Sequence, residues 1–401
     1  MRLHYIPRNG GFSMRSFIAV MLVAVCIVAF GSACQDRKTK VIKIALASML
    51  SGGQSGLGEM IKLGAQLAVE EAQPGFAAKG FTLEFWPNDD QAQPDVGVAV
   101  ARRIVNDPDV LGLVGHFNSG ITIPTSEVYK DFDLVMVSPG STNPKVTDRG
   151  FANVNRVCGR DDVQGPVGAE FAVNDLGAKK ILVVHDKTAY GQGIALNFEA
   201  KAKELGAEVV GVIGTEEKTN FQSLILQMQI LKPDLVFFGG IYDQAGVLLK
   251  QMREKNETAK FLGPDGLESS AFVDIAQQAA KGAYYTTVAG PVSQYPAAKE
   301  FAERFTAKFN RPPEAYALYA YDAANVILKA IETSMNATGG KRPTRKAVAA
   351  EVRKTSIEGI TGTVSFDGKG DRSKADYYVI HFAEASYPGS VVKVISSAPP
   401  K

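Results

Sequence analysis

Three short loops rich in glycine and hydroxyl-bearing residues each follow an apolar run. They are His-Phe-Asn-Ser-Gly at 116–120, Pro-Gly-Ser-Thr at 139–142 and Gly-Pro-Asp-Gly at 263–266. Backbone N–H groups at a helix start, joined by Ser and Thr hydroxyls, suit a small carboxylate. An acid on an opposing segment suits an ammonium group. The three loops therefore predict a clamp for a zwitterion.

Each loop also has an ordinary structural interpretation. Ser119 can simply cap a helix, and Pro139-Gly140 can simply form a turn. All three loops nevertheless follow strand-like runs, and ligands of open α/β sheets bind at the carboxyl ends of the strands. This coincidence favours a binding site.

The run His185-Asp186-Lys187 suggests an enzyme, because an acid can orient a histidine. Catalysis also needs a nucleophile and an oxyanion site. The chain has no nucleophile elbow, zinc-protease, Cys-x-x-Cys or phosphate-loop motif and only four histidines. Cys158 stands in no catalytic pattern and suits a small buried hydrophobe. We expect no catalysis, no metal and no cofactor.

The elements that must position these loops alternate between short apolar runs and amphipathic stretches. Strands are expected at 41–48, 82–86, 110–115 and 134–138, and again at 180–185, 208–213 and 235–239. Helices are expected at 58–72, 94–106, 121–130, 193–205, 221–231 and 245–255. Strands separated by helices indicate βαβ units with right-handed crossovers. The expected fold is α/β, with two doubly wound parallel-sheet lobes.

The C-terminal third changes rhythm, with helices expected at 297–309 and 315–335 and strands at 362–365, 377–381 and 391–396. We expect residues 41–160 and 290–364 to form the first lobe. The second lobe is expected to contain residues 161–289 and 365–398.

The N-terminus has the pattern of an export signal. Arg15 precedes an apolar run at 17–30 that ends in Gly31-Ser32-Ala33-Cys34. The run is shorter than the roughly 20 residues of a membrane span. Residues 1–33 are thus expected to be a signal, with Met14 the better start, and 34–40 a tether.

Small residues leading into Cys34 resemble the lipobox of bacterial lipoproteins, although Gly31 stands where leucine is usual. Lipidation of Cys34 would hold the protein in the periplasm or on the outer face of the cell membrane. The alternative is plain cleavage, which would release a protein with an ordinary free cysteine.

The charge of the exported chain is close to neutral. Residues 1–33 hold three arginines and no acid, which leaves 41 basic and 42 acidic residues. The sequence has no extended basic patch, so we do not expect nucleic acid as a partner.

The chain resembles the leucine-isoleucine-valine-binding proteins, the type I solute-binding components of ABC importers. The resemblance covers residues 41 to about 396 and rests on several strings. They are Ser51-Gly52, Val114-Gly115-His116 with Ser119, 138–142, Asp162 to Pro166, His185 to Gly193, Gly239-Gly240 and 263–266. The resemblance implies two lobes joined by a multi-strand hinge that close around one amino acid.

Site roles follow from the resemblance position by position. Ser119 and Thr142, with neighbouring Ser141, would hold the α-carboxylate. The Gly140 carbonyl and Asp265, with Gly266 beside it, would take the α-ammonium. The pocket would be lined by Phe117, Asn118 and Tyr190.

The pocket walls depart from the family pattern. Asp265 replaces the usual glutamate, and Leu57 and Ile241 stand where well-matched members have tyrosines. The shorter acid either draws the lobes closer or leaves room for a water. The ligand is thus expected to be an aliphatic amino acid, branched-chain or other.

The resemblance implies a monomeric carrier that delivers its ligand to a permease with ATPase partners. One alternative is a periplasmic sensor for amino acids, amides or small carboxylates. Another is an extracytoplasmic enzyme on the same scaffold, because fold alone does not fix function.

Overall fold

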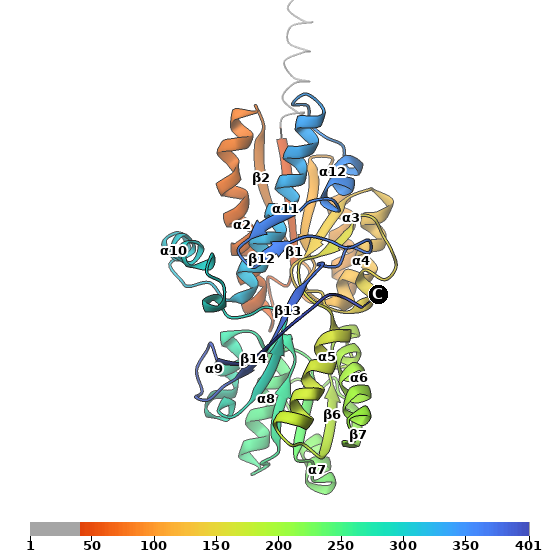
Figure 1. Cartoon of the computed structure of the whole chain (residues 1–401), viewed down its shortest axis with the longest axis vertical. Coiled ribbons are helices and arrows are strands. Elements are labelled where there is room, and N and C mark those ends of the chain that lie inside the picture. Colours follow the sequence, from red (N-terminus) through yellow and green to blue (C-terminus); the bar gives the residue numbers. More distant parts are fainter. Residues whose placement is uncertain (1–40, 401) are drawn as a thin grey trace, which may run out of the picture.

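The computed structural model describes residues 41–400, so the expected signal, the tether and Cys34 lie outside the described residues. The chain folds into two α/β lobes stacked along the long axis of the molecule (Figure 1). Within the described part of the chain, no helix combines the length and apolar character that a membrane span requires.

Five parallel strands form the sheet of the first lobe, in the order β2-β1-β3-β4-β5. They are β1 (Val41–Ser48), β2 (Thr82–Asp89), β3 (Val110–Gly115), β4 (Val135–Ser138) and β5 (Val154–Arg156). The helices of this lobe are α2 (Ser55–Ala78), α3 (Pro94–Val105), α4 (Ser119–Asp131), α10 (Ala298–Phe309), α11 (Ala315–Ala337) and α12 (Arg345–Val352). All residues of β3 and β4 are buried, as in parallel strands covered on both faces.

Helices cover both faces of this sheet. Helix α11 packs against α2 so closely that a Cβ on Gly64 would lie 2.0 Å from the Ala317 carbonyl oxygen. The other face packs Ala45 and Met136 against apolar residues of α3 and α4, such as Ile104.

Seven strands form the second sheet, in the order β14-β13-β10-β9-β8-β6-β7. They are β6 (Lys180–His185), β7 (Glu208–Gly214), β8 (Leu235–Gly239), β9 (Lys260–Gly263), β10 (Tyr284–Thr287), β13 (Ala375–His381) and β14 (Ser390–Ser397). The helices of this lobe are α5 (Asp161–Glu170), α6 (Ala189–Glu204), α7 (Gln222–Leu231), α8 (Tyr242–Glu254) and α9 (Ser270–Ala276). A separate hairpin pairs β11 (Ile357–Gly359) with β12 (Gly362–Val364).

The expected α/β fold with two doubly wound lobes is confirmed. Strands β7-β6-β8-β9-β10 are parallel and repeat the 2-1-3-4-5 order of the first sheet. The C-terminal strands β13 and β14, which fall in the segment where the sequence rhythm changes, join the second sheet antiparallel. The short connection between these two strands permits only antiparallel pairing. The exact division of the chain between the lobes stays a prediction.

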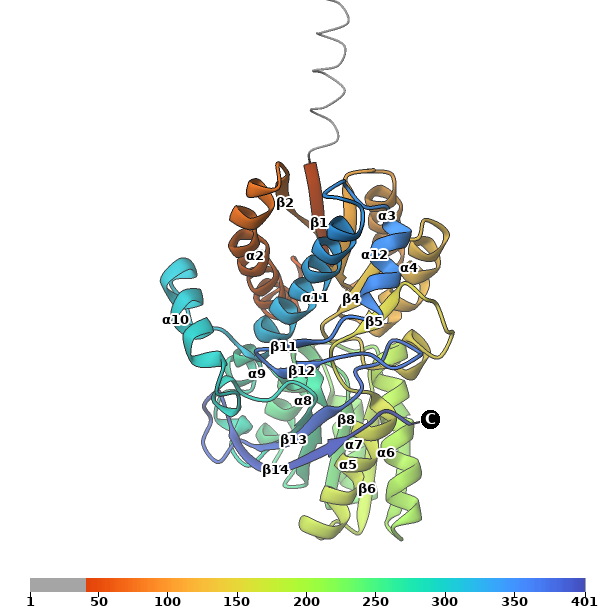
Figure 2. The ribbon, with the colours of Figure 1, turned by 45° about the horizontal axis from the view of Figure 1, so that its top comes forward.

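The chain passes between the lobes three times. The passages lie between β5 and α5, between β10 and α10, and between β12 and β13. Figure 2 shows the β11-β12 hairpin at this junction, between α11 of the first lobe and strands β13 and β14 of the second.

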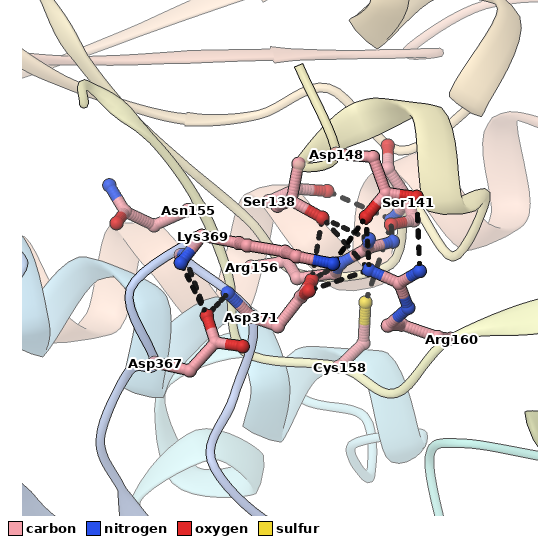
Figure 3. A network of polar contacts seen from close by, with 12 residues as sticks. Ser138, Ser141, Asp148, Asn155, Arg156, Cys158, Arg160, Asp367, Lys369 and Asp371 are labelled. Carbon is pink, nitrogen blue, oxygen red and sulfur yellow. Dashed lines mark hydrogen bonds and ion pairs between the residues drawn. The ribbon is translucent and has the colours of Figure 1, made fainter. Parts of the chain in front are cut away.

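A cluster of ion pairs with a buried centre, formed by Arg156, Arg160 and Asp371, joins two of the three passages (Figure 3). Arg156 Nε donates to Asp371 Oδ1 at 2.5 Å, and Arg160 Nη1 donates to Asp371 Oδ2 at 2.7 Å. Arg160 also pairs with Asp148 at 3.0 Å and with Asp162 at 2.7 Å. We call these five residues the hinge network. Burial opposes the charge of Asp371, but Arg156, Thr147 and Arg160 outweigh it and lower the pKa of this carboxyl.

Replacing Asp371 with alanine should destabilise the protein strongly. Arg156 would keep its charge in a fully buried position without its carboxylate partner. Breaking a buried pair in this way costs about 3–5 kcal/mol of unfolding free energy. Urea denaturation followed by circular dichroism measures the loss.

The matched control is Glu384→Ala, which removes an exposed ion pair with Lys281. This change should alter the unfolding free energy by less than about 1 kcal/mol. Equal effects of the two substitutions would contradict the role assigned to Asp371.

Candidate ligand-binding site

The loops after β3 and β4 are tied together at the carboxyl edge of the first sheet. Ser138 Oγ donates to the His116 carbonyl oxygen at 2.6 Å. Ser141 Oγ lies 2.9 Å from the same oxygen and 2.7 Å from the Phe117 carbonyl oxygen. The Ser141 hydroxyl is thus engaged within the lobe and shapes the loop that carries Thr142.

His116 supports this edge from behind. Its Nδ1 lies 2.7 Å from Asp90 Oδ2 and its Nε2 lies 2.8 Å from the Tyr129 hydroxyl. The ring is fully buried. With both ring nitrogens occupied, His116 holds the loops in place.

The expected carboxylate clamp lies beside these bonds. Ser119 is the first residue of α4, and its Oγ accepts from the Asn143 backbone N at 3.2 Å. Thr142 is fully buried, and its hydroxyl has no hydrogen-bond partner among the described residues. Gly140 must be glycine here, because a Cβ would lie 2.4 Å from the Phe117 ring and 3.0 Å from that of Tyr316.

Asp265 of the second lobe faces this clamp. Its Oδ1 accepts from the Tyr190 hydroxyl at 2.7 Å, and its Oδ2 accepts from the Tyr316 hydroxyl at 2.6 Å. The Gly266 backbone N donates to the Tyr190 oxygen at 2.8 Å. Burial raises the pKa of Asp265, while its hydrogen bonds oppose the shift. Burial and then Asp265 raise the pKa of both tyrosines, so their hydroxyls stay protonated donors.

Apolar and aromatic side chains complete the walls. The rings of Phe117 and Tyr316 meet edge to face at 4.9 Å. Leu57 and Ile241 are both buried in the apolar core, and their contact with a ligand stays a prediction. Asn118 lies further out and helps to line a cavity of about 590 Å³ between the lobes, together with Tyr190.

The two lobes are closed on one another. Asn143 Nδ2 of the first lobe donates to the Ala189 carbonyl oxygen of the second at 2.7 Å. Tyr316 reaches from α11 to Asp265, and Ser270 Oγ donates to Glu314 Oε1 at 2.6 Å. The loops expected from the sequence therefore converge, although their contacts with a ligand stay predictions.

Three residues of this site escaped the sequence analysis. Tyr316 follows no strand and arrives from a helix more than 100 residues beyond Tyr190. Asp161 and Gln164 belong to α5, a helix that was not expected. Only the Asp-x-Gln-Gly-Pro string around Gln164 carried a signal in the sequence.

His185 and Asp186 make contacts that shape a turn. His185 Nδ1 accepts from the Lys187 backbone N at 3.1 Å, and Asp186 Oδ1 accepts from the Thr188 N and Oγ1. Burial raises the pKa of Asp186 to about 6. Within residues 41–400, no group of three or more His, Cys, Asp and Glu side chains is placed to hold a metal ion.

Known proteins share this architecture. A family model described as periplasmic binding protein matches residues 41–386. The leucine-, isoleucine-, valine-, threonine-, and alanine-binding protein of Pseudomonas aeruginosa is 34% identical, over 90% of this chain and 94% of the relative.

Two solved structures extend the comparison. The leucine-binding protein LivK of Thermotoga maritima has a TM-score of 0.80 and 30% identity, covering 88% of this chain and 98% of that one. The branched-chain amino acid transporter substrate binding protein LivJ of Streptococcus pneumoniae, in complex with isoleucine, has a TM-score of 0.79 and 25% identity. It covers 90% of this chain and 100% of that one.

Cys158 should be unreactive in the folded protein. The thiol is 1% exposed, and burial raises its pKa to about 12. Thiolate is the reactive form, so a chain from Gln35 onward, whose only cysteine is Cys158, should resist Ellman's reagent at pH 8. One equivalent should react after unfolding in urea. Rapid labelling of the native protein would contradict the buried, inert thiol.

Proposed function

The chain belongs to the periplasmic binding protein family, and from this premise we propose that it is the solute-binding component of an ABC importer. Its ligand is an amino acid, with branched-chain or other aliphatic side chains favoured. It carries this ligand to a permease driven by ATPases.

One observation carries the proposal. Asp265 is 1% exposed and lies between a tyrosine of each lobe, near Asp161, whose backbone N binds the Thr142 carbonyl oxygen. A buried acid facing hydroxyls and a helix start matches the two charges of a zwitterion. The names of the relatives, which bind leucine, isoleucine, valine, threonine or alanine, support the same class of ligand.

Binding works by shifting the lobes from an open to a closed arrangement. Each hydrogen bond to a charged group contributes about 1.5–3 kcal/mol, and burying a leucine-sized side chain contributes about 1.5–3 kcal/mol more. The charged clamp therefore fixes the class of ligand. Leu57, Ile241 and Phe117, which are all buried, select among side chains.

The carrier acts outside the cytoplasm, as a monomer without catalytic activity. The engagement of His185 and Asp186 in a turn supports a role without catalysis. The N-terminal signal and Cys34 support a lipid anchor that keeps the carrier near its permease and raises its effective concentration there. Mass spectrometry of the mature N-terminus tests this attachment.

A thermal-shift screen of the chain from Gln35 onward against the common amino acids tests the function. At least one aliphatic amino acid should raise the melting temperature in a saturable manner, because a ligand that binds only the folded state stabilises it. If none does, aromatic acids, amides and small peptides come next, and the proposed ligand class is wrong.

Asp265→Ala should abolish this stabilisation and leave the fold intact. Removing one partner of a buried charged pair costs about 2–5 kcal/mol of binding free energy. Isothermal titration calorimetry measures the affinity, with Asp274→Ala on the exposed side of α9 as the control. Unchanged affinity in the Asp265 variant would rule out its contact with the ammonium.

A further inference from the structure

Asp161 is a second buried acid beside the site. It is the first residue of α5, directly after the passage from β5, and it is fully buried. Its backbone N donates to the Thr142 carbonyl oxygen at 3.0 Å. Neither of its carboxylate oxygens has a hydrogen-bond partner among residues 41–400. An unpaired buried carboxylate is costly, so this position needs a reason.

Two further buried oxygens share this condition. Thr142 Oγ1 and Gln164 Oε1 also lack a partner within the described chain. Gln164 Nε2 donates to the Thr286 carbonyl oxygen at 3.0 Å, which leaves its carbonyl oxygen as the free end of the amide. The Thr142 hydroxyl lies near the Asp161 carboxyl and opposes the rise of its pKa, although the two groups are not in hydrogen-bond geometry. Three acceptor side chains, from Asp161, Gln164 and Thr142, thus stand unused.

Asp265 differs from Asp161 in this respect. Both of its oxygens already accept a tyrosine hydroxyl. The charge of Arg156 acts on Asp161, but its guanidinium donates to Asp371, the carbonyl oxygens of Ser141 and Asn143, and the Thr147 hydroxyl. Burial and then the charge of Asp265 raise the pKa of Asp161. The two acids therefore lie near one another, and among residues 41–400 no cation is bonded to the oxygens of Asp161.

An ammonium group fits this set of atoms. It carries three N–H donors and no acceptor, and Asp161, Gln164 and Thr142 offer three unused acceptor groups. Resting on the proposed function, we infer that Asp161 is a second direct counter-ion of the ligand ammonium beside Asp265, whose oxygens also bind the two tyrosines that close the lobes. The site is thereby restricted to ligands with a free ammonium next to their carboxylate, and it rejects plain carboxylates.

Calorimetry of the chain from Gln35 onward, with leucine, isoleucine, valine, threonine and alanine as probes, tests this assignment. Asp161→Asn keeps the shape of the side chain and removes its charge. The variant should bind the tightest-binding of these amino acids at least about 30-fold more weakly. This factor is the lower end of the cost of removing one partner of a buried charged pair. Asp175→Asn, which removes an exposed pair with Lys393, should change affinity less than about threefold.

Two more readouts separate binding from folding. Without ligand, the Asp161→Asn chain should melt at the same temperature as the wild type or higher, because a buried unpaired charge has been removed. The wild type should prefer leucine over 4-methylpentanoate, its deaminated form, and the variant should lose most of this preference. A residue with a merely structural role would lower the melting temperature and leave the preference unchanged.

The outcomes are distinct. Weak binding by Asp161→Asn, with a stable fold and a lost preference for the amine, supports the inference. Wild-type binding with unchanged affinity in Asp161→Asn overturns the inference and leaves the proposed function standing. A wild type that binds none of the five amino acids overturns the proposed function, and the inference falls with it.

Discussion

Arg156 stands at the point on which the two-lobed arrangement depends. Its side chain is fully buried and forms an ion pair with Asp371 on the third passage between the lobes (Figure 3). The same guanidinium donates to the carbonyl oxygens of Ser141 and Asn143, which flank Thr142. One cation therefore holds the hinge and the Thr142 loop in a fixed relation. Any movement of the hinge network changes the geometry of the proposed ligand clamp as well.

A buried network of this kind is a poor source of stability. Desolvating several charges costs as much as their attraction returns, and apolar residues of equal volume are often as stable. Its effect here is geometric, because Asp371 receives Arg156 and Arg160 on different oxygens and so aligns two passages. A hinge that keeps its passages aligned while the lobes rotate suits a protein that must open and close around a ligand.

The fold and the site were predictable from the sequence to different extents. Strands such as β3 and β8 are continuous apolar runs between turn residues, so the sequence predicts where they begin and end. Strand β5 is three residues long and carries Arg156, so neither length nor apolar pattern marks it. The prediction that the first helix ends near residue 72 was wrong, because α2 continues through Pro74 to Ala78. Tertiary packing against α11 offsets the single lost hydrogen bond.

Local patterns located the loops of the site but could not assign each atom. Ser141 looked like a ligand contact, yet its hydroxyl is engaged with two carbonyl oxygens of the neighbouring loop. Tyr316 lies in the helix expected at 315–335 and had no predicted role, yet its hydroxyl crosses to Asp265 of the other lobe. Such partners depend on how distant segments meet, and no local spacing encodes them.

The contacts of Asp265 explain how the site accommodates an aspartate where the family usually has a glutamate. A shorter acid reaches less far into the site, and two tyrosine hydroxyls, one from each lobe, come to it instead. Asp265 then stabilises closure through neutral donors that stay protonated. Asp161, with both oxygens unpaired among residues 41–400, adds a second negative charge beside Asp265. In the proposed arrangement Asp265 links the ammonium to the tyrosines of both lobes, and Asp161 supplies oxygens that no group of the protein already occupies.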